Sequence, residues 1–377
     1  MFRGPEFRLC VPVLISIDDH GRAVRISDTL VEVVRLVAPH NSNPIGFLYG
    51  GYMLNWLVDA GTIAAMDFAR SDLVLGFLDR MHFVSPVRIG SILVYRAWVV
   101  NSGRSSLTVL VESYVKERDG VRLATVGRLI YVKIGPNGRP EPIGVDLERG
   151  EGWEAVVYDH FSRWRRSVEP ALRNEGVSHD LPHLSSVLSM PEDATSTGIM
   201  YGGRLLYYLD QFNAIAAFNF APLTYVTANV NAVAFRRPIY IGDVVDVRAG
   251  VTYVGTSSLE VTFDVHARGK AGERHVAEGR STFVHVDEEG RPAPIGAPPM
   301  GDEEARRRKE EELREAKALR ALRPDLDVRR PALVEALASG NGHQRCRQHD
   351  YRDKEHEAPD GLPPPEDLEA VQDPQRY

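Results

Sequence analysis

The 377-residue sequence contains only two cysteines, Cys10 and Cys346, and they lie near opposite ends of the chain. Thiols so few and so far apart predict neither a disulfide framework nor a cysteine metal cluster, and they favour a reducing, cytoplasmic setting. The longest apolar stretch near the start, residues 9–17, is too short to cross a bilayer. An excess of positive charge is also lacking, because the formal net charge is −7, which argues against a general nucleic-acid binder.

The sequence does contain a long internal repeat. The glycine pair Gly50 and Gly51 recurs as Gly202 and Gly203, an offset of 202 − 50 = 152, and residues 46–144 match residues 198–296 without a gap at 35 of 99 positions. Such self-similarity marks a duplicated structural unit. The sequence therefore predicts an N-terminal arm (1–26), a first unit (27–144), a linker with a helix (145–178), a second unit (179–296), and a charged helix with a disordered tail (297–377).

Both units show the same predicted order of elements. A strand (30–37; 184–190) leads to the glycine pair, and an alanine-rich helix with few charges follows it (52–69; 204–221). Such helices are buried on most faces. The strands predicted next in the first unit, at 87–101, 106–117 and 123–133, are β-branched runs separated by glycine turns. The predicted fold class is α+β, with two tandem units in which an antiparallel sheet covers one long helix. The aromatic residues of a linker helix at 153–172 are expected to pack on a unit, and the charged helix at 302–322 is expected to be solvated.

Two features of the helices are candidates for a role in catalysis. The glycine pair leaves unpaired amides at the positive end of a helix, where a developing oxyanion is stabilised, although a tight turn explains a glycine pair equally well. Asp210 lies two turns into an otherwise apolar helix, which is costly for a carboxylate unless it is paired or functional. The alternatives are that Asp210 faces solvent or binds a hydroxyl group in a purely structural role.

The two copies differ at the positions of interest. Val58 aligns with Asp210, and Asp59 is displaced from that position by about 100° around the helix. In the loop before the glycines, the first unit has Asn43 and the second has Thr195. Because each unit keeps one distinctive polar residue, the pattern indicates one composite site.

The ordered set of motifs, found twice, resembles the tandem hotdog-fold acyl-CoA thioesterases. It comprises Gly-x-x-Tyr-Gly-Gly, a helix with an acid, Phe-x-x-Pro-x-x-x-Gly, Gly-x-Ser-Ser and Gly-Arg-Pro, and it covers residues 27–296. The resemblance implies that two hotdog units pair with continuous sheets, and that each active site lies where the helix start of one unit meets the helix acid of the other. Tyr49 and Tyr201 replace the histidine that many members have before the glycines, and Ala214 replaces a hydroxyl residue found in some.

The resemblance also implies roles for individual residues. Gly50 matches the oxyanion-binding amide, Asn43 matches an amide that orients water or thioester, and Asp210 matches a carboxylate that acts as general base or nucleophile. The companion site, with Gly202, Thr195 and Val58, is expected to be inactive. The implied substrate-binding residues, for pantetheine and phosphate, are Gly51, Gly103, Arg104, Ser105, Arg236, Thr256 and Ser257; a solvated turn explains Arg104 equally well, and surface charge explains Arg236. No metal and no separate cofactor is expected, since coenzyme A is part of the substrate. A homo-oligomer is expected, since relatives often assemble as trimers of the double unit.

The predicted function is hydrolysis of fatty acyl-CoA to fatty acid and coenzyme A. One alternative is a hotdog protein that senses acyl-CoA or a nucleotide without hydrolysing it. A second alternative is a hotdog dehydratase, which normally needs a histidine–acid pair, and no histidine lies at the helix start in this sequence.

Overall fold

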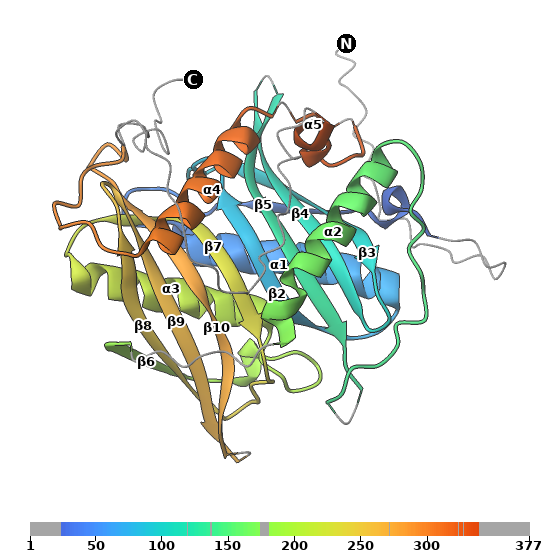
Figure 1. Ribbon diagram of the computed structural model, residues 1–377, viewed down its shortest axis with the longest axis horizontal. Helices are drawn as coiled ribbons and strands as arrows, with labels where there is room; N and C mark the ends of the chain where they lie inside the picture. The colour runs from blue at the N-terminus through green and yellow to red at the C-terminus, as the bar shows by residue number, and fades with distance from the viewer. Residues whose placement is uncertain are drawn as a thin grey trace, which may run out of the picture.

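A computed structural model describes residues 24–118, 120–135, 138–173, 181–270, 272–322, 324–326 and 328–338. Both cysteines, most of the predicted N-terminal arm and the predicted disordered tail lie outside the described residues. Figure 1 shows the arrangement, in which a broad curved sheet separates two groups of helices.

The sheet has ten antiparallel strands in the order β1-β3-β4-β5-β2-β7-β10-β9-β8-β6. Each copy of the repeat contributes five neighbouring strands, and β2 and β7 join the two halves. The predicted α+β class, with one antiparallel sheet and a long helix for each repeat, is therefore confirmed. The strands are β1 (Val31–Leu36), β2 (Leu73–Phe83), β3 (Ile92–Ser102), β4 (Ser106–Glu117), β5 (Gly120–Lys133), β6 (His183–Leu188), β7 (Tyr225–Phe235), β8 (Val244–Val254), β9 (Ser258–Gly269) and β10 (Gly272–His285).

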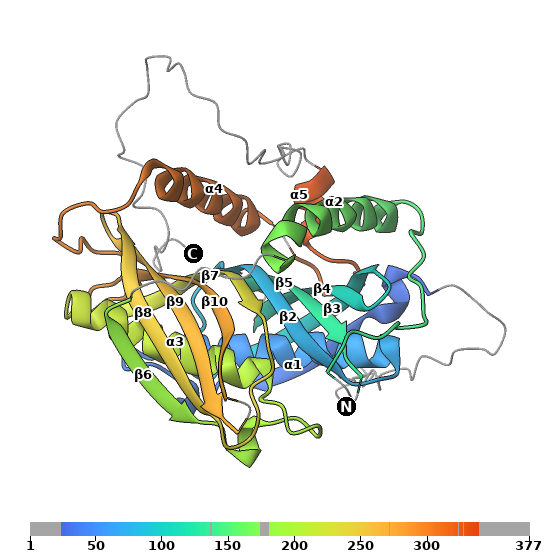
Figure 2. The same ribbon diagram turned by 60° about the horizontal axis from the view of Figure 1, so that its bottom comes forward.

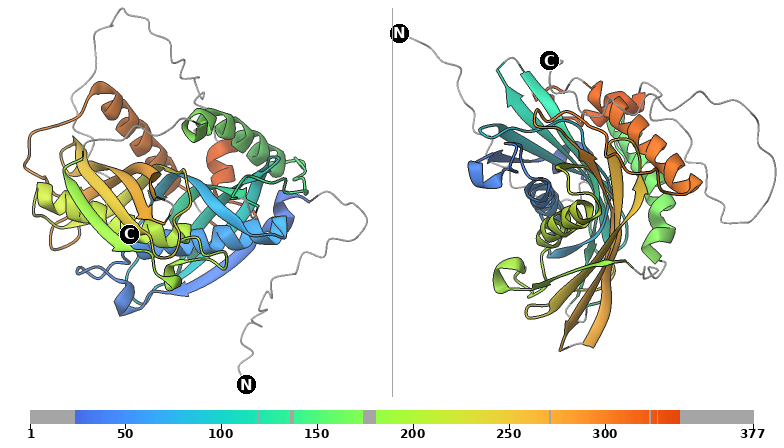
Figure 3. Two further views of the ribbon diagram at one scale, coloured as in Figure 1. Left: turned by 90° about the horizontal axis from the view of Figure 1, so that it is seen from below. Right: turned by 90° about the vertical axis from the view of Figure 1, so that its left-hand side faces the viewer.

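The two long helices, α1 (Gly50–Ala69) and α3 (Gly202–Phe220), lie side by side on the concave face of the sheet, as the end-on view in Figure 3 shows. Three helices cover the opposite face (Figure 2): α2 (Trp153–Arg173), α4 (Glu303–Arg320) and α5 (Leu333–Ala338). Short 3-10 turns precede β1 and the loops before α1 and α3 (Ile26–Thr29, Pro39–Asn41 and Pro191–Asp193). Across the described ranges, no helix is long and apolar enough to cross a bilayer.

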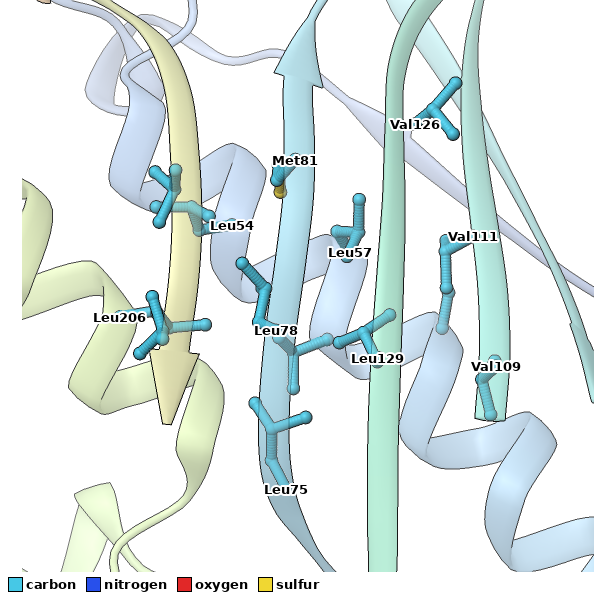
Figure 4. Close-up of a cluster of buried hydrophobic side chains, with 14 of the residues drawn as sticks. Leu54, Leu57, Leu75, Leu78, Met81, Val109, Val111, Val126, Leu129 and Leu206 are labelled. Carbon is cyan, nitrogen blue, oxygen red and sulfur yellow. The ribbon is translucent and has the colours of Figure 1, made fainter. Parts of the chain in front are cut away.

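The core lies between the concave face and the two long helices. Leu54 and Leu57 of α1 are buried against side chains of β2, β4 and β5, as Figure 4 shows around Leu78 and Leu129. A small residue on the sheet allows this close approach. At Gly127 of β5, an added Cβ would lie 3.1 Å from the Leu57 side chain. Burial of apolar area on this scale is the main force that holds the helices in the sheet.

The resemblance implied a continuous sheet, but the two strands that join its halves, β2 and β7, were not predicted, because neither residues 73–83 nor residues 225–235 were assigned to strands. Arg80 and Ala232, equivalent at the 152-residue offset, both adopt positive φ there, 49° and 50°. The Asp79 carboxylate accepts from the Ala232 amide at 3.3 Å, and the Asn231 side chain accepts from the Arg80 amide at 3.0 Å. These irregular backbone positions interrupt the alternating pattern by which strands are identified in a sequence.

Helix α4 is solvated on one face only, and the packing of its other face on the sheet was not predicted. Lys309 and Glu312 are buried, and Lys309 Nζ lies 2.5 Å from the carboxylate of the fully buried Glu260 on β9. Glu315 forms ion pairs with Arg80 and Arg128, which hold its pKa well below the usual range although burial raises it. Some charges of α4 therefore face opposite charges on the sheet, while others on the same helix are exposed.

The linker helix α2 also packs on this face, as its aromatic residues predicted. Phe161 and Trp164 are buried, and Trp164 Nε1 donates to Asp79 Oδ2 at 3.2 Å. Beyond α4, the amides of Ala332 and Leu333 donate to the fully buried Glu112 of β4 and so fix the start of α5. The limits of the predicted domains remain a prediction.

Candidate active site

The start of α1 lies against the middle of α3. A Cβ atom built on Gly50 would be 2.9 Å from Asp210 Oδ2 and 2.6 Å from the Thr227 hydroxyl of β7. Only a residue without a side chain fits this position, because a real Cβ is essentially never found so close to other heavy atoms. The glycine of the first copy and the acid of the second copy, far apart in the sequence, are therefore in contact.

Asp210 is 1% exposed. The Thr227 hydroxyl donates to its Oδ1 at 2.7 Å, whereas Oδ2 accepts no hydrogen bond of good geometry from the described residues. Burial raises the pKa of Asp210 to about 6, although Thr227, the Tyr49 hydroxyl and the Gly51 amide oppose the rise. A carboxylate with a pKa near 6 is ionised at neutral pH and still accepts a proton readily, as a general base must.

A pocket of about 150 Å³ opens beside this contact. Asn43, Gly50, Tyr49 and Thr227 line its polar end. The Asn43 side-chain oxygen accepts from the Phe47 amide at 3.0 Å, which fixes the loop, and its Nδ2 group donates to no other described residue. Asn43 and Gly50 thus line one pocket, whereas Asp210 contacts Gly50 without lining the pocket itself, and the roles of all three in catalysis remain predictions.

Two residues next to Asp210 were not identified as site residues from the sequence. Thr227 was missed because its strand was not recognised, and Tyr49 was considered only as a replacement for histidine. Burial and then the charge of Asp210 raise the pKa of Tyr49 well above its usual range, so the Tyr49 hydroxyl stays protonated beside the carboxylate. Alignment of the copies contained a signal for Thr227, since the equivalent residue is the aliphatic Leu75.

The equivalent position at the start of α3 differs in chemistry. A Cβ atom on Gly202 would meet the Leu75 side chain at 2.9 Å instead of oxygen atoms. The Tyr201 hydroxyl lies 3.1 Å from the hydroxyl of Thr62, which aligns with Ala214. No carboxylate takes the place of Asp210, since Val58 is fully buried there.

Asp59, next to Val58, has a different environment from Asp210. Its side chain is 24% exposed and pairs with Arg35 of β1 at 3.2 Å. The Asp59 carboxylate is near enough to the Tyr201 hydroxyl to raise the pKa of that tyrosine, after the larger effects of burial and of Tyr131. Asp59 thus lies near the Tyr201 hydroxyl of the companion position, but it already forms an ion pair with Arg35.

The predicted substrate-binding residues are dispersed. Gly51 is buried next to Gly50, and its amide faces Asp210. Thr256 and Ser257 form the turn before β9. The first residue of β9 pairs with Val284 of β10, and Val284 in turn pairs with Val226 of the pocket wall. The equivalent turn with Gly103, Arg104 and Ser105 lies at the corresponding end of the first copy, and none of these turn residues in either copy lines the pocket. Arg236 pairs with Glu278 and donates to the Leu172 carbonyl, so its charge is already neutralised.

Comparison with known proteins gives concordant matches. A family model described as the thioesterase superfamily matches residues 45–121 and 197–272, and these two matches begin 152 positions apart. The cytosolic acyl coenzyme A thioester hydrolase of Mus musculus is 24% identical over 292 residues, which are 70% of this chain and 76% of the relative. The acyl-CoA thioester hydrolase YciA of Escherichia coli is 34% identical over 123 residues, 30% of this chain and 93% of the relative.

Among solved structures, the acyl-CoA hydrolase of Staphylococcus aureus in complex with butyryl coenzyme A and coenzyme A is 24% identical, with a TM-score of 0.37, and the match covers 40% of this chain and 93% of that one. Two long helices held side by side in one continuous sheet, with two matches to one family model, define a double hotdog protein. The chain belongs to the thioesterase superfamily, with acyl-CoA thioester hydrolases as its relatives.

Proposed function

We propose that this protein hydrolyses acyl-CoA thioesters at a single site made from both copies of the repeat. Family membership supports the class of reaction. One observation supports the site: the buried carboxylate of Asp210, with a pKa of about 6, lies at the first amides of α1 beside a pocket. The names of the mammalian relatives describe them as cytosolic acyl coenzyme A thioester hydrolases.

In the proposed reaction, the Asp210 carboxylate removes a proton from a water molecule, and the water oxygen forms a bond to the thioester carbon. The carbonyl oxygen becomes negative and accepts from the Gly50 amide, which as a first-turn amide has no acceptor within the helix. The carbon–sulfur bond then breaks, and the coenzyme A sulfur leaves and takes up the proton held by Asp210. The Nδ2 group of Asn43 is oriented to hold the water or the thioester oxygen.

The companion position is proposed to be inactive. It has Val58 in place of Asp210 and Leu75 in place of Thr227, so no group there accepts the proton of the water. Asp59 does not replace the missing base, because it is partly exposed and paired with Arg35. Each chain then provides one active site for two repeats.

The decisive experiment is a thiol-release assay with acyl-CoAs of increasing chain length. We expect the wild-type chain to release free thiol, and Asp210→Asn to lower kcat by about 1,000-fold, since general base catalysis contributes roughly 10²–10⁴. The matched control Asp59→Asn is expected to stay within about threefold. Binding of acyl-CoA without any thiol release by the wild type would favour a sensor instead, and a dominant loss in Asp59→Asn would transfer the reaction to the companion position.

Further assembly is also proposed, as a trimer of the double unit. Exposed apolar side chains recur at equivalent positions of both copies, which is unusual for surfaces that face water. These pairs are Leu36 and Leu188, Ile63 and Ile215, Met66 and Phe218, and Ile89 and Ile241. Because both copies keep them, we infer that further copies of this chain cover them, and sedimentation velocity would report the number of chains.

A further inference from the structure

An arginine with no acidic partner among the described residues stands at the rim of the pocket. Pro86 and Val87 line the pocket, and Arg88 follows them directly in the chain. The Arg88 guanidinium lies over the ring of Phe47, another lining residue, 4.9 Å from the ring centroid. Arg88 is exposed, and its side chain forms neither an ion pair nor a hydrogen bond with the described residues. Its five N–H donors and its positive charge are therefore available to a bound anion.

The arginines that were predicted to bind phosphate are placed less well. Arg236 is paired with Glu278, and the turn that contains Arg104 does not line the pocket. Arg88 was not considered because its place at the rim depends on the fold, in which a backbone bridge joins it to Phe47 of the loop before α1.

The two copies of the repeat differ in charge at this point. Tyr240 of the second copy aligns with Arg88, and it removes one positive charge there. Asp243 aligns with Ser91, and it adds one negative charge. The buried Asp243 pairs with Arg274, which lies 5.2 Å from the centroid of the Tyr240 ring, so the positive charge in the second copy is neutralised. Both differences make the first copy more positive, and the first copy supplies the loops that line the pocket.

A second arginine lies beside Arg88. Arg122, which aligns with Arg274, donates to the Pro86 carbonyl at 3.1 Å and pairs with Glu117 at 2.8 Å. The side chains of this pair are 33% and 49% exposed, and an ion pair in such a setting is weak. Two arginines with one exposed acid leave the rim attractive to an anion.

Resting on the proposed function, we infer that Arg88 binds a phosphate group of the coenzyme A moiety, and that it makes the enzyme selective for coenzyme A thioesters over thioesters that lack the nucleotide. A guanidinium and a phosphate form charge-assisted hydrogen bonds, often two in parallel. The nucleotide is the part of the substrate that stays in solvent, and the exposed Arg88 lies on the solvent side of the pocket.

The length of the coenzyme A arm agrees with this position. The thioester sulfur and the first phosphorus are joined by a chain of roughly thirteen bonds, about 15 Å when extended, since three bonds of an extended backbone span about 3.3–3.6 Å. The thioester carbon must lie beside Gly50, which is at most about 11 Å from Phe47 because three residues separate them in the chain. An arm that runs from Gly50 past the Phe47 ring therefore brings its phosphates to Arg88.

The test compares two substrates with the same acyl group, an acyl-CoA and the S-acyl pantetheine that lacks the nucleotide and its phosphates. In Arg88→Gln we expect KM for the acyl-CoA to rise about tenfold at low ionic strength, the effect of one charge-assisted hydrogen bond, with kcat within about twofold. KM for the S-acyl pantetheine should change by less than about twofold. Arg88→Lys, which keeps the charge, should recover part of the loss, and salt of about 0.5 M should reduce the difference between Arg88→Gln and the wild type.

The matched control is Arg248→Gln, which removes one exposed positive charge from β8, outside the pocket. It should keep the wild-type KM for both substrates. A rise in KM for the acyl-CoA in Arg248→Gln as large as that in Arg88→Gln would mean that net charge alone attracts the substrate, and it would overturn the inference.

Binding of coenzyme A itself separates this inference from the proposed function, because it needs no turnover. Weaker calorimetric binding of coenzyme A by Arg88→Gln, with an unchanged melting temperature, supports the inference even if the wild type releases no thiol, in which case only the proposed function fails. An unchanged Kd for coenzyme A, or an equal rise of KM for the acyl-CoA and the S-acyl pantetheine, would show that Arg88 only supports Phe47. Either result overturns the inference, and thiol release by the wild type would then leave the proposed function standing.

Discussion

The two helix starts of this molecule have the same backbone but different surroundings. At the start of α1, Gly50 faces two oxygen atoms, those of Asp210 and Thr227, whereas Gly202 at the start of α3 faces the hydrocarbon side chain of Leu75. A helix start attracts negative charge wherever it occurs, so the glycine pair alone defines no active site. The difference teaches that the chemistry depends on what the other copy presents to the glycine. Both copies have kept the glycine pair at the helix start, but only the start of α1 faces a carboxylate and a hydroxyl from the other copy.

After Asp210→Asn, the largest loss of activity is expected from a side chain added at Gly50. Gly50→Ala places a methyl group 2.9 Å from Asp210 Oδ2, and we expect it to lower kcat by about 100-fold, comparable to the loss of one oxyanion donor. Gly202→Ala meets only Leu75, so it should lower the melting temperature and leave kcat within about threefold. Steady-state kinetics and thermal melts on both variants measure the contrast; equal activity losses would mean that both helix starts are used.

A smaller effect is expected at the loop residues. Asn43→Ala removes an amide that lines the pocket, and a hydrogen bond to a group that becomes charged is worth about 1.5–3 kcal/mol, so kcat should fall about 30-fold. Thr195→Ala, the equivalent change in the second copy, should leave kcat within about twofold. If the two variants lost activity equally, the loops would have a shared structural role rather than a catalytic one.

The Thr227 hydroxyl should affect the pH dependence more than the maximal rate. It donates to Asp210 and lowers the carboxyl pKa, so Thr227→Val should raise that pKa above its value of about 6. The rise of kcat with pH should then move to higher pH, with a rate about tenfold lower at pH 6 and nearly normal at pH 9. Leu75→Val, at the equivalent position, should leave the profile unchanged. A profile of Thr227→Val that coincides with the wild type would show that the hydroxyl does not tune the carboxylate.

The last comparison concerns stability, and its sign follows from the pKa of Asp210. The folded value of about 6 exceeds the unfolded value of about 3.9, so the folded state holds the proton more tightly. Asp210 therefore destabilises the fold progressively as pH rises from about 4 to 6, up to about 3 kcal/mol above that window. Asp210→Asn should be more stable than the wild type at pH 7 and similar to it at pH 4, as urea unfolding at both pH values can test. A variant that is less stable at pH 7 would mean that the carboxylate is fully compensated.

Much of the fold followed from the duplication, because motifs at a constant offset must form equivalent elements. The contact between Gly50 and Asp210 was also within reach, since the copies differ at Asn43 and Asp210. Thr227 was missed because it lies on β7, a strand whose backbone irregularities hide its alternation. Comparison of polar with aliphatic residues between the copies would have identified it, without any knowledge of the strand.

The packed face of α4 was not predicted for another physical reason. Opposite charges at helical spacing stabilise a solvated helix, and the same charges can pair with a sheet. Which of the two occurs depends on Arg80, Arg128 and Glu260, which are distant in sequence and meet α4 only in the folded chain. A single sequence does not show which charges, 50 to 240 residues apart, form ion pairs in the folded chain.

Helix α4 has one further consequence, for the order in which the molecule is completed. Its acidic residues pair with Arg80 and Arg128 of the first copy, while Lys309 pairs with Glu260 of the second copy, so one helix ties both halves across the β2–β7 seam. Helix α4 follows both copies of the repeat in the chain, so it leaves the ribosome after them. Until it docks, the cations of one half and the anion of the other face water, and the two halves are joined by β2–β7 pairing and by the contact of α1 with α3.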